Sequence, residues 1–151
     1  MSHVVRSVEI MAPVERVYEQ WARVEEYPRF LEDVDAVSQL PGGRLRWVSS
    51  VGGERHEWLT DVVESQPHRR IALRADEAGL HAAGVLLFEP VGPAQTRLTV
   101  QLDWLQDQLF APDERTAVIH VEHALEALKG FLETHGGGEI RRVSGDLAPM
   151  N

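Results

Sequence analysis

The chain of 151 residues contains no cysteine, and this absence excludes several kinds of protein at once. Disulfide frameworks, thiolate nucleophiles and cysteine-ligated zinc sites all need a cysteine. The sequence also lacks any run approaching the roughly 20 apolar residues that a membrane-spanning helix requires. Residues 1–10 lack the long apolar core of a signal peptide. Together these absences favour a cytoplasmic protein with no integral membrane segment.

Positive charge is scarce. There are 15 lysine and arginine residues against 24 aspartate and glutamate residues, for a formal net charge of −9. An acidic surface repels phosphate backbones, and no compact basic patch overcomes that repulsion. Nucleic acid is therefore not an expected partner. The hydrophobic fraction of 43% is ordinary for a folded globular chain.

Familiar catalytic motifs are missing as well. The sequence has no Gly-x-Ser-x-Gly elbow, no phosphate-binding glycine loop and no His-Glu-x-x-His. His120 and His123 stand three residues apart in a helical segment, a spacing that can bring two metal ligands together. Both fall outside the apolar stripe of that helix, and no third ligand is apparent. We therefore expect a solvated histidine pair, no metal site and no cofactor.

What the sequence does contain is a change of hydrophobic period. Alternation from Val4 to Ile10 predicts a first strand, which ends at Ala12-Pro13. Helical spacing then predicts a short helix over Val14 to Trp21, and a second is expected around residues 27–31. Period two returns, and turn signals predict six more strands: residues 34–40, 43–51, 55–65, 69–76, 81–90 and 95–104. The short connections predict hairpins, and so an antiparallel sheet.

The last third of the chain returns to a helical period. Pro112-Asp113-Glu114 marks a helix start, with acidic residues at the positive end of the helix dipole, and Gly136-Gly137-Gly138 marks its end. The apolar stripe consists of Val118, Val121, Leu125, Leu128 and Leu132. We expect one domain over residues 1–138 and a flexible polar tail over residues 139–151.

A seven-stranded sheet with one apolar face has to bury that face. The C-terminal helix, at about 20 residues and ~30 Å, is the only predicted element long enough to do so. One helix leaves part of a curved sheet uncovered, and the two short helices close part of the rest. The class is therefore α+β, and the space left over predicts an internal cavity.

Seven short segments occur in an order typical of a known family. They are IMAPVERVY (10–18), YPRFL (27–31), RLRW (44–47), GERHEW (53–58), PHRRI (67–71), GVLLFEP (84–90) and TRLTV (96–100). The ordered set resembles the SRPBCC superfamily, also called START-like or helix-grip, and more closely its polyketide cyclase/dehydrase-like branch. The resemblance implies a helix-grip fold: a seven-stranded curved antiparallel sheet wrapped around a long C-terminal helix, with two short helices after the first strand. Superfamily members include aromatase/cyclases of aromatic polyketide synthesis, coenzyme Q-binding proteins and lipid carriers, so the fold does not imply one reaction.

Strand alternation predicts which side chains face the cavity. The expected inward residues are Leu45, Trp47, Ser49 and Val51; His56, Trp58, Thr60 and Val62; Ile71, Leu73 and Ala75; Gly84, Leu86 and Phe88; and Leu98, Val100, Leu102 and Trp104. This lining is mostly aliphatic, with three tryptophans and few polar groups. It suits a flat or polyisoprenoid-like ligand that one or two hydrogen bonds orient.

The predicted ligand-binding residues are Phe30, Trp47, Ser49, His56, Trp58, Thr60, Leu73, Leu86, Phe88, Val100, Trp104, Val121, Leu125 and Leu128. For each aromatic residue the alternative is that it only fills the core. His56 is the polar candidate for acid–base chemistry. Its position just after Gly52-Gly53 equally predicts a solvated histidine at the open end of the sheet. No catalytic residue is predicted.

Three functions fit these patterns. The first is a binding module for a hydrophobic small molecule such as a lipid, a quinone or a polyketide-like compound, with the segment at residues 27–31 as part of a gate. The second is a cyclase or dehydratase that folds an aromatic polyketide precursor, where positioning supplies most of the rate. The third is an interaction module whose acidic surface meets a basic partner. The first is favoured, because no acid–base pair or nucleophile stands out.

Overall fold

The computed structural model describes residues 2–32, 34–51, 53–77, 80–104 and 114–135. The elements are β1 (Ser2–Ile10), α1 (Val14–Ala22), the 3-10 helix η1 (Val24–Arg29), β2 (Val34–Leu40), β3 (Arg44–Val51), β4 (Glu54–Gln66), β5 (Arg70–Glu77), β6 (Leu80–Gly92), β7 (Gln95–Trp104) and α2 (Glu114–His135). The α+β class and the predicted order of elements are confirmed. The predicted tail at 139–151 and the helix start at 112–113 lie outside the described residues.

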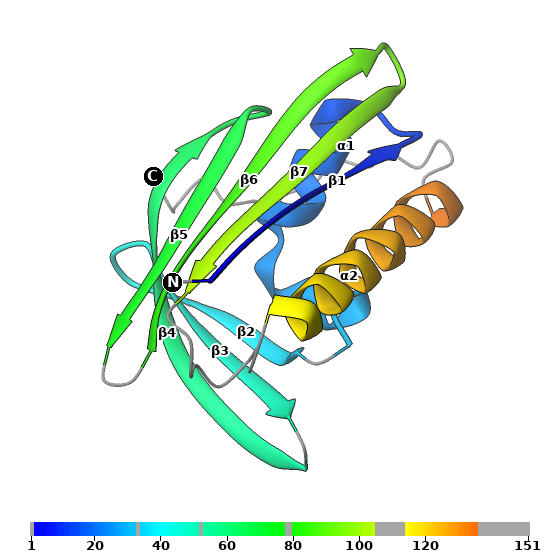
Figure 1. The fold of residues 1–151 in the computed structure, drawn as a ribbon. Coiled ribbons are helices and arrows are strands. Elements are labelled where there is room, and N and C mark those ends of the chain that lie inside the picture. Colours follow the sequence, from blue (N-terminus) through cyan, green and yellow to red (C-terminus); the bar gives the residue numbers. More distant parts are fainter. Residues whose placement is uncertain (1, 33, 52, 78–79, 105–113, 136–151) are drawn as a thin grey trace.

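The seven strands form one antiparallel sheet in the order β1-β7-β6-β5-β4-β3-β2 (Figure 1). From β2 to β7 each strand pairs with the next one along the chain, as the short turns predicted. β1 pairs instead with β7, from Ser2 opposite Trp104 to Ile10 opposite Thr96. The first strand therefore completes the sheet beside the last.

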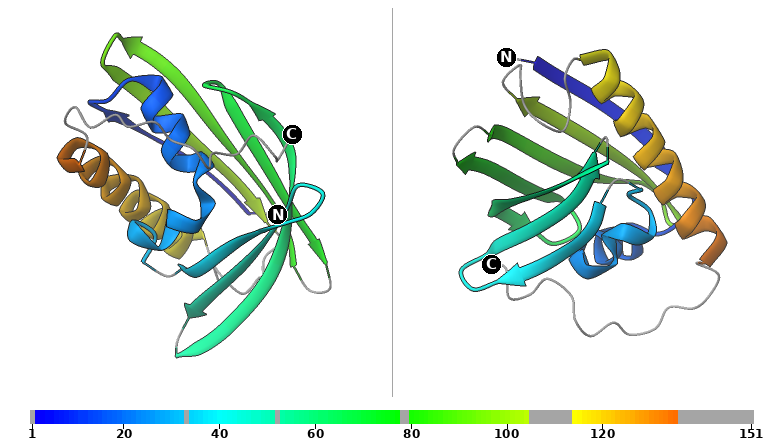
Figure 2. Two further views of the ribbon diagram at one scale, coloured as in Figure 1. Left: turned by 180° about the vertical axis from the view of Figure 1, so that it is seen from behind. Right: turned by 90° about the horizontal axis from the view of Figure 1, so that it is seen from below.

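The three helices lie on the concave side of the sheet (Figures 1 and 2). α2 packs against β1, η1 packs against β2, and α1 packs against β6 and β7. The predicted stripe of α2 is the face that packs: Leu128 and Leu132 are fully or almost fully buried, Val121 and Leu125 are buried, and Val118 is half-buried. None of the described helices is both long and apolar enough to span a bilayer.

The boundaries of η1 and β6 are among those that differ from the predictions. The second short helix was expected around residues 27–31, but η1 spans Val24–Arg29 and leaves Leu31 outside. β6 was expected to end at Pro90 but continues to Gly92. β5 begins at Arg70, which pairs with Leu87. Pro90 therefore lies beyond the paired part of β5, and its missing N–H faces no strand on that side.

Candidate functional site

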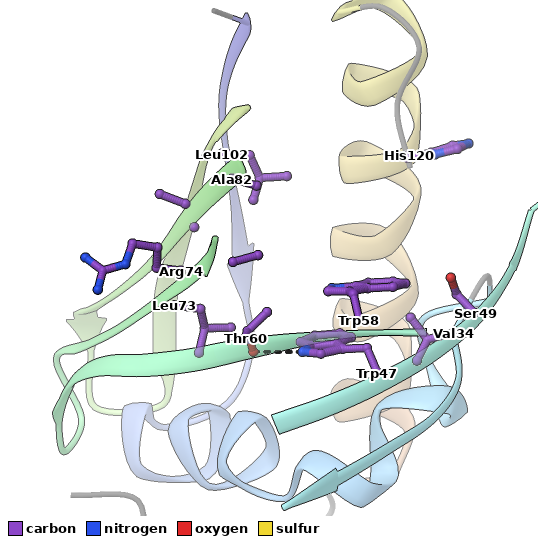
Figure 3. Close-up of a pocket in the computed structure, with 13 residues that line it drawn as sticks. Val34, Trp47, Ser49, Trp58, Thr60, Leu73, Arg74, Ala82, Leu102 and His120 are labelled. Atoms are coloured by element: carbon purple, nitrogen blue, oxygen red, sulfur yellow. Dashed lines mark hydrogen bonds between the residues drawn. The ribbon is translucent and has the colours of Figure 1, made fainter. Parts of the chain in front are cut away.

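Apolar space lies between the inner face of the sheet and α2, in two adjoining chambers. The outer chamber has a volume of about 270 Å³ and is lined by Val34, Trp47, Ser49, Trp58, Thr60, Leu73, Arg74, Ala75, Ala82, Ala83, Gly84, Leu102 and His120 (Figure 3). The inner chamber has about 250 Å³ and is lined by Trp21, Tyr27, Leu31, Trp47, Leu73, Gly84, Val85, Leu86, Val100, Leu102, His120, Val121, Ala124 and Leu125. Five residues line both, so the chambers adjoin each other.

Two stacked indole rings, called the Trp47–Trp58 platform below, border the outer chamber. Trp47 and Trp58 are opposite each other in the β3–β4 register, with ring centroids 5.8 Å apart and planes only 7° from parallel. The Trp47 indole N–H donates to Thr60 Oγ1 over 2.9 Å (Figure 3), and this hydrogen bond fixes the ring orientation. The strand pairing thus places a rigid aromatic platform along the cavity.

Small side chains leave the space on the other side of this chamber. Ala75 pairs with Ala82, and Gly84 pairs with both Leu73 and Leu102. A Cβ on Gly84 would lie 3.1 Å from Leu102 Cδ2, so even one added methyl group would crowd that wall. The side chain of Arg74, on the opposite face of β5, points away from the cavity (Figure 3). The outer chamber is therefore a slot between indoles and a wall of small and aliphatic residues.

Few polar atoms border the chambers. Ser49 is 3% exposed and Trp21 is 7% exposed, and neither Ser49 Oγ nor Trp21 Nε1 has a hydrogen-bond partner in the part of the chain that the structure describes. The Tyr27 hydroxyl donates to the Trp21 carbonyl oxygen over 2.7 Å. Complete burial raises the pKa of Tyr27 far above its usual value, because the anion would lose its hydration. The interior therefore disfavours charge.

A third hollow, of about 560 Å³, forms a groove between α2 and the segment that joins η1 to β2. Its lining includes Phe30 and Leu31 on one side and Ala124 and Ala127 on the other. Leu31, His120 and Ala124 also line the inner chamber, so the groove adjoins the cavity. It lies at the segment that the sequence predicted to be part of a gate.

Charged and aromatic contacts cross this groove. His123 Nδ1 lies 3.7 Å from Glu32 Oε2, and both side chains are exposed. The Arg29 guanidinium lies over the ring of Phe131, 5.1 Å from its centroid. Phe131 also packs against Phe30, with centroids 5.8 Å apart. These contacts join η1 and the segment after it to α2.

The structure places most of the predicted ligand-binding residues in the cavity wall. Trp47, Ser49, Trp58, Thr60 and Leu73 line the outer chamber, Leu86, Val100, Val121 and Leu125 line the inner one, and Phe30 lines the groove. The other four lie elsewhere: Phe88 packs edge-on against Tyr18, Trp104 and Leu128 are fully buried in the core, and half-buried His56 lies 3.9 Å from Glu54. Contact of any of these side chains with a ligand is still a prediction.

His120 and Trp21 are among the lining residues that were not predicted. His120 was expected to be merely solvated; its side chain is exposed, but the residue also borders both chambers and the groove. Trp21 was placed on the apolar face of the first short helix, and the structure brings that face against the inner chamber. Among the described residues, no group of three His, Asp or Glu side chains is arranged to hold a metal ion.

A curved antiparallel sheet, a long helix across its concave face and an apolar cavity between them define a helix-grip ligand-binding fold. Residues 10–133 match the model of the family described as polyketide cyclase/dehydrase and lipid transport. The chain belongs to this family, as its resemblance to the SRPBCC superfamily implied.

The chain is also similar to individual proteins. An uncharacterised 17.2 kDa protein from the melC2-rnhH intergenic region of Streptomyces lincolnensis is 29% identical over 145 residues, which cover 90% of this chain and 93% of the relative. A START superfamily protein from Mycobacterium smegmatis has a TM-score of 0.77 at 22% identity, with 87% of this chain and 97% of that chain covered. The Zhui aromatase/cyclase from Streptomyces sp. R1128 has a TM-score of 0.71 at 23% identity, with 92% and 99% covered. The structural likenesses show the fold.

Proposed function

We propose that this protein binds a hydrophobic small molecule in the cavity between the sheet and α2. The observation that carries the proposal is the adjoining pair of chambers, walled by the Trp47–Trp58 platform and by aliphatic side chains. A pocket of this kind, apolar with a few placed polar groups, is typical of small-molecule sites. The description of the family to which the chain belongs names polyketide cyclases and lipid transport, and both activities need such a cavity.

The adjoining groove supports a route for the ligand. It lies between α2 and the segment after η1, and it shares three lining residues with the inner chamber. Separation of these two elements would break the exposed His123–Glu32 pair and the contacts around Phe131. We place the entrance here.

The first experiment is native mass spectrometry of the purified protein, followed by solvent extraction and identification of released compounds. We expect one equivalent of a lipid, quinone or polyketide-like molecule. If the protein is empty, the same spectra recorded after incubation with apolar probes such as 2-methylnaphthalene test whether it takes up such compounds. A protein that takes up no apolar compound in either experiment does not have the proposed function.

The alternative function is a cyclase or dehydratase that acts on an aromatic polyketide precursor, since one protein of similar fold is the Streptomyces aromatase/cyclase Zhui. No residue of the described cavity favours it over binding. Incubation of a reactive poly-β-keto thioester with the protein tests it, because an enzyme would change the distribution of cyclised products.

The cytoplasmic location and the exclusion of nucleic acid also stay predictions, the second supported by the net charge of −9.

A further inference from the structure

Two buried hydrogen-bonding groups in the cavity wall have no partner within the described chain. They are the hydroxyl of Ser49, in the outer chamber, and the indole N–H of Trp21, in the inner chamber. Native interiors pair the large majority of such groups, because an unpaired one loses its hydrogen bonds to water without replacement. Both are therefore candidates to bond a ligand.

The other polar side chains that reach the chambers already have a partner. Thr60 Oγ1 accepts the hydrogen bond from Trp47, and the Tyr27 hydroxyl donates to the Trp21 carbonyl. Ser49 lines the outer chamber but not the inner one, whereas Trp21 lines the inner chamber but not the outer one. The two unpaired groups thus belong to residues that border different chambers.

The chambers offer no charge to a ligand. Among the described lining residues there is no lysine, aspartate or glutamate, and Arg74 points away (Figure 3). The titratable side chain at the boundary is His120, which is exposed. Away from His120, a carboxylate or ammonium group in the chambers would lose its hydration without gaining an ion pair. The bound molecule is therefore expected to be uncharged.

The shape of the outer chamber selects a flat molecule. The Trp47 and Trp58 rings are nearly parallel, and Ala75, Ala82 and Gly84 add little thickness to the other wall. A conjugated ring system can stack on an indole face along its whole area, which a branched or globular molecule cannot. Shape and polarity together narrow the class of ligand.

We propose that the ligand is an uncharged, flat, conjugated molecule with carbonyl oxygens on two opposite edges, one bonded by the Ser49 hydroxyl and the other by the Trp21 indole N–H. Carbonyl oxygens are specified because an indole N–H only donates and a serine hydroxyl can donate. This inference rests on the proposed function and names its ligand class.

Three small probes of matched size test the inference by equilibrium dialysis. Menadione is a neutral naphthoquinone with carbonyls on opposite edges, 2-methylnaphthalene lacks them, and 2-naphthoate carries a charge. Menadione alkylates thiols, but the chain has no cysteine, so its binding is reversible here. The quantity compared is the menadione preference, the Kd of 2-methylnaphthalene divided by the Kd of menadione in the same variant. This ratio cancels general effects of a mutation on the cavity.

We expect Ser49→Ala and Trp21→Phe each to lower the menadione preference about fivefold, the value of one hydrogen bond. The matched control is Ser50→Ala, because Ser50 is the exposed neighbour and bonds Asp35 over 2.6 Å on the outer face. It should leave the preference unchanged. We also expect 2-naphthoate to bind the wild-type protein at least about tenfold more weakly than 2-methylnaphthalene.

An unchanged preference in either Ser49→Ala or Trp21→Phe overturns the two-ended arrangement, and tight binding of 2-naphthoate overturns the uncharged class. In both cases 2-methylnaphthalene would still bind, so the proposed function would stand. If none of the three probes binds the wild-type protein, and extraction also releases nothing, the proposed function fails together with the inference.

Discussion

The Trp58 side chain contributes both to the packing of the sheet and to the proposed ligand site. Its ring stacks on Trp47 across the β3–β4 hairpin, while the residue also lines the outer chamber. A half-buried tryptophan contributes less to folding than a fully buried one, because part of its surface is still exposed in the empty protein. The surface left open is available to a ligand.

We expect Trp58→Ala to lower the free energy of unfolding by about 2 kcal/mol. This value is smaller than the cost of deleting a fully buried tryptophan, because Trp58 is only half-buried. The same change should weaken binding of 2-methylnaphthalene, because the platform would lose one of its two rings. Urea titration and equilibrium dialysis measure the two effects. Leu59→Ala, at the half-buried neighbour on the other face of β4, is the control and should affect stability without affecting binding. An unchanged Kd in a folded Trp58→Ala variant would show that the ring does not contact the ligand.

Period-two alternation located Trp47, Ser49 and Trp58 correctly in the cavity wall because a strand has only two faces, one of which is apolar here. The same pattern could not show that Thr60 is bonded to Trp47, since this depends on side-chain geometry across two strands. His120 was not predicted as a lining residue because it lies on the flank of α2 beside the apolar stripe and not within the stripe. The signal was present: Ala124 and Ala127 are small residues on that flank, and both line the groove.

At the scale of elements, polar contacts hold α2 against the N-terminal part of the chain. Arg6 on β1 donates to Glu122 over 2.9 Å. Near the other end of α2, the Glu133 carboxylate accepts from the Met11 backbone N–H over 2.9 Å and from Lys129 Nζ over 2.7 Å. These bonds to Lys129 and Met11 lower the pKa of Glu133. The charged form of Glu133 therefore stabilises the packing of α2.

We expect Glu133→Gln to lower the free energy of unfolding at pH 7 by about 0.5–1 kcal/mol, a small value because solvent screens the site. The contribution is complete above the ordinary glutamate pKa and is lost as the pH falls through the lower pKa of the folded state. The difference between variant and wild type should therefore shrink to nearly nothing in acid. Thermal unfolding from pH 7 to pH 3 measures it, with Glu126→Gln, at an exposed glutamate on the same helix, as the control. A difference that is constant with pH would contradict this role for the charge.

Element type was predictable where the hydrophobic period was long and regular, as in α2 and β7. The limits of η1 were not, because its backbone bonds Glu26 N–H to the Arg23 carbonyl and Phe30 N–H to the Tyr27 carbonyl follow a 3-10 pattern with no long apolar period. β6 continues past Pro90 because a strand tolerates proline where one of its edges is unpaired. The edge of β6 is unpaired there because β5 begins only at Arg70. Such features depend on tertiary context.

For the whole molecule, an unfilled cavity lowers stability, because its lining atoms lose dispersion contacts and apolar burial is incomplete. The small residues Ala75, Ala82 and Gly84 maintain the space, although larger residues on these strands would increase burial. Stability and ligand uptake should therefore respond in opposite directions to a side chain that fills the outer chamber.

We expect Ala82→Leu to raise the free energy of unfolding of the empty protein by about 1–2 kcal/mol, and the Tm by roughly 3–6 °C, because the added carbons occupy the chamber. Binding of 2-methylnaphthalene should fall at least about tenfold, since the ligand and the new side chain compete for one space. Ala36→Leu, at an exposed alanine of β2, should change neither quantity appreciably. Differential scanning calorimetry with and without the probe measures both effects. A lower Tm combined with unchanged binding would mean that the added side chain disturbs the sheet and that the ligand lies outside the outer chamber.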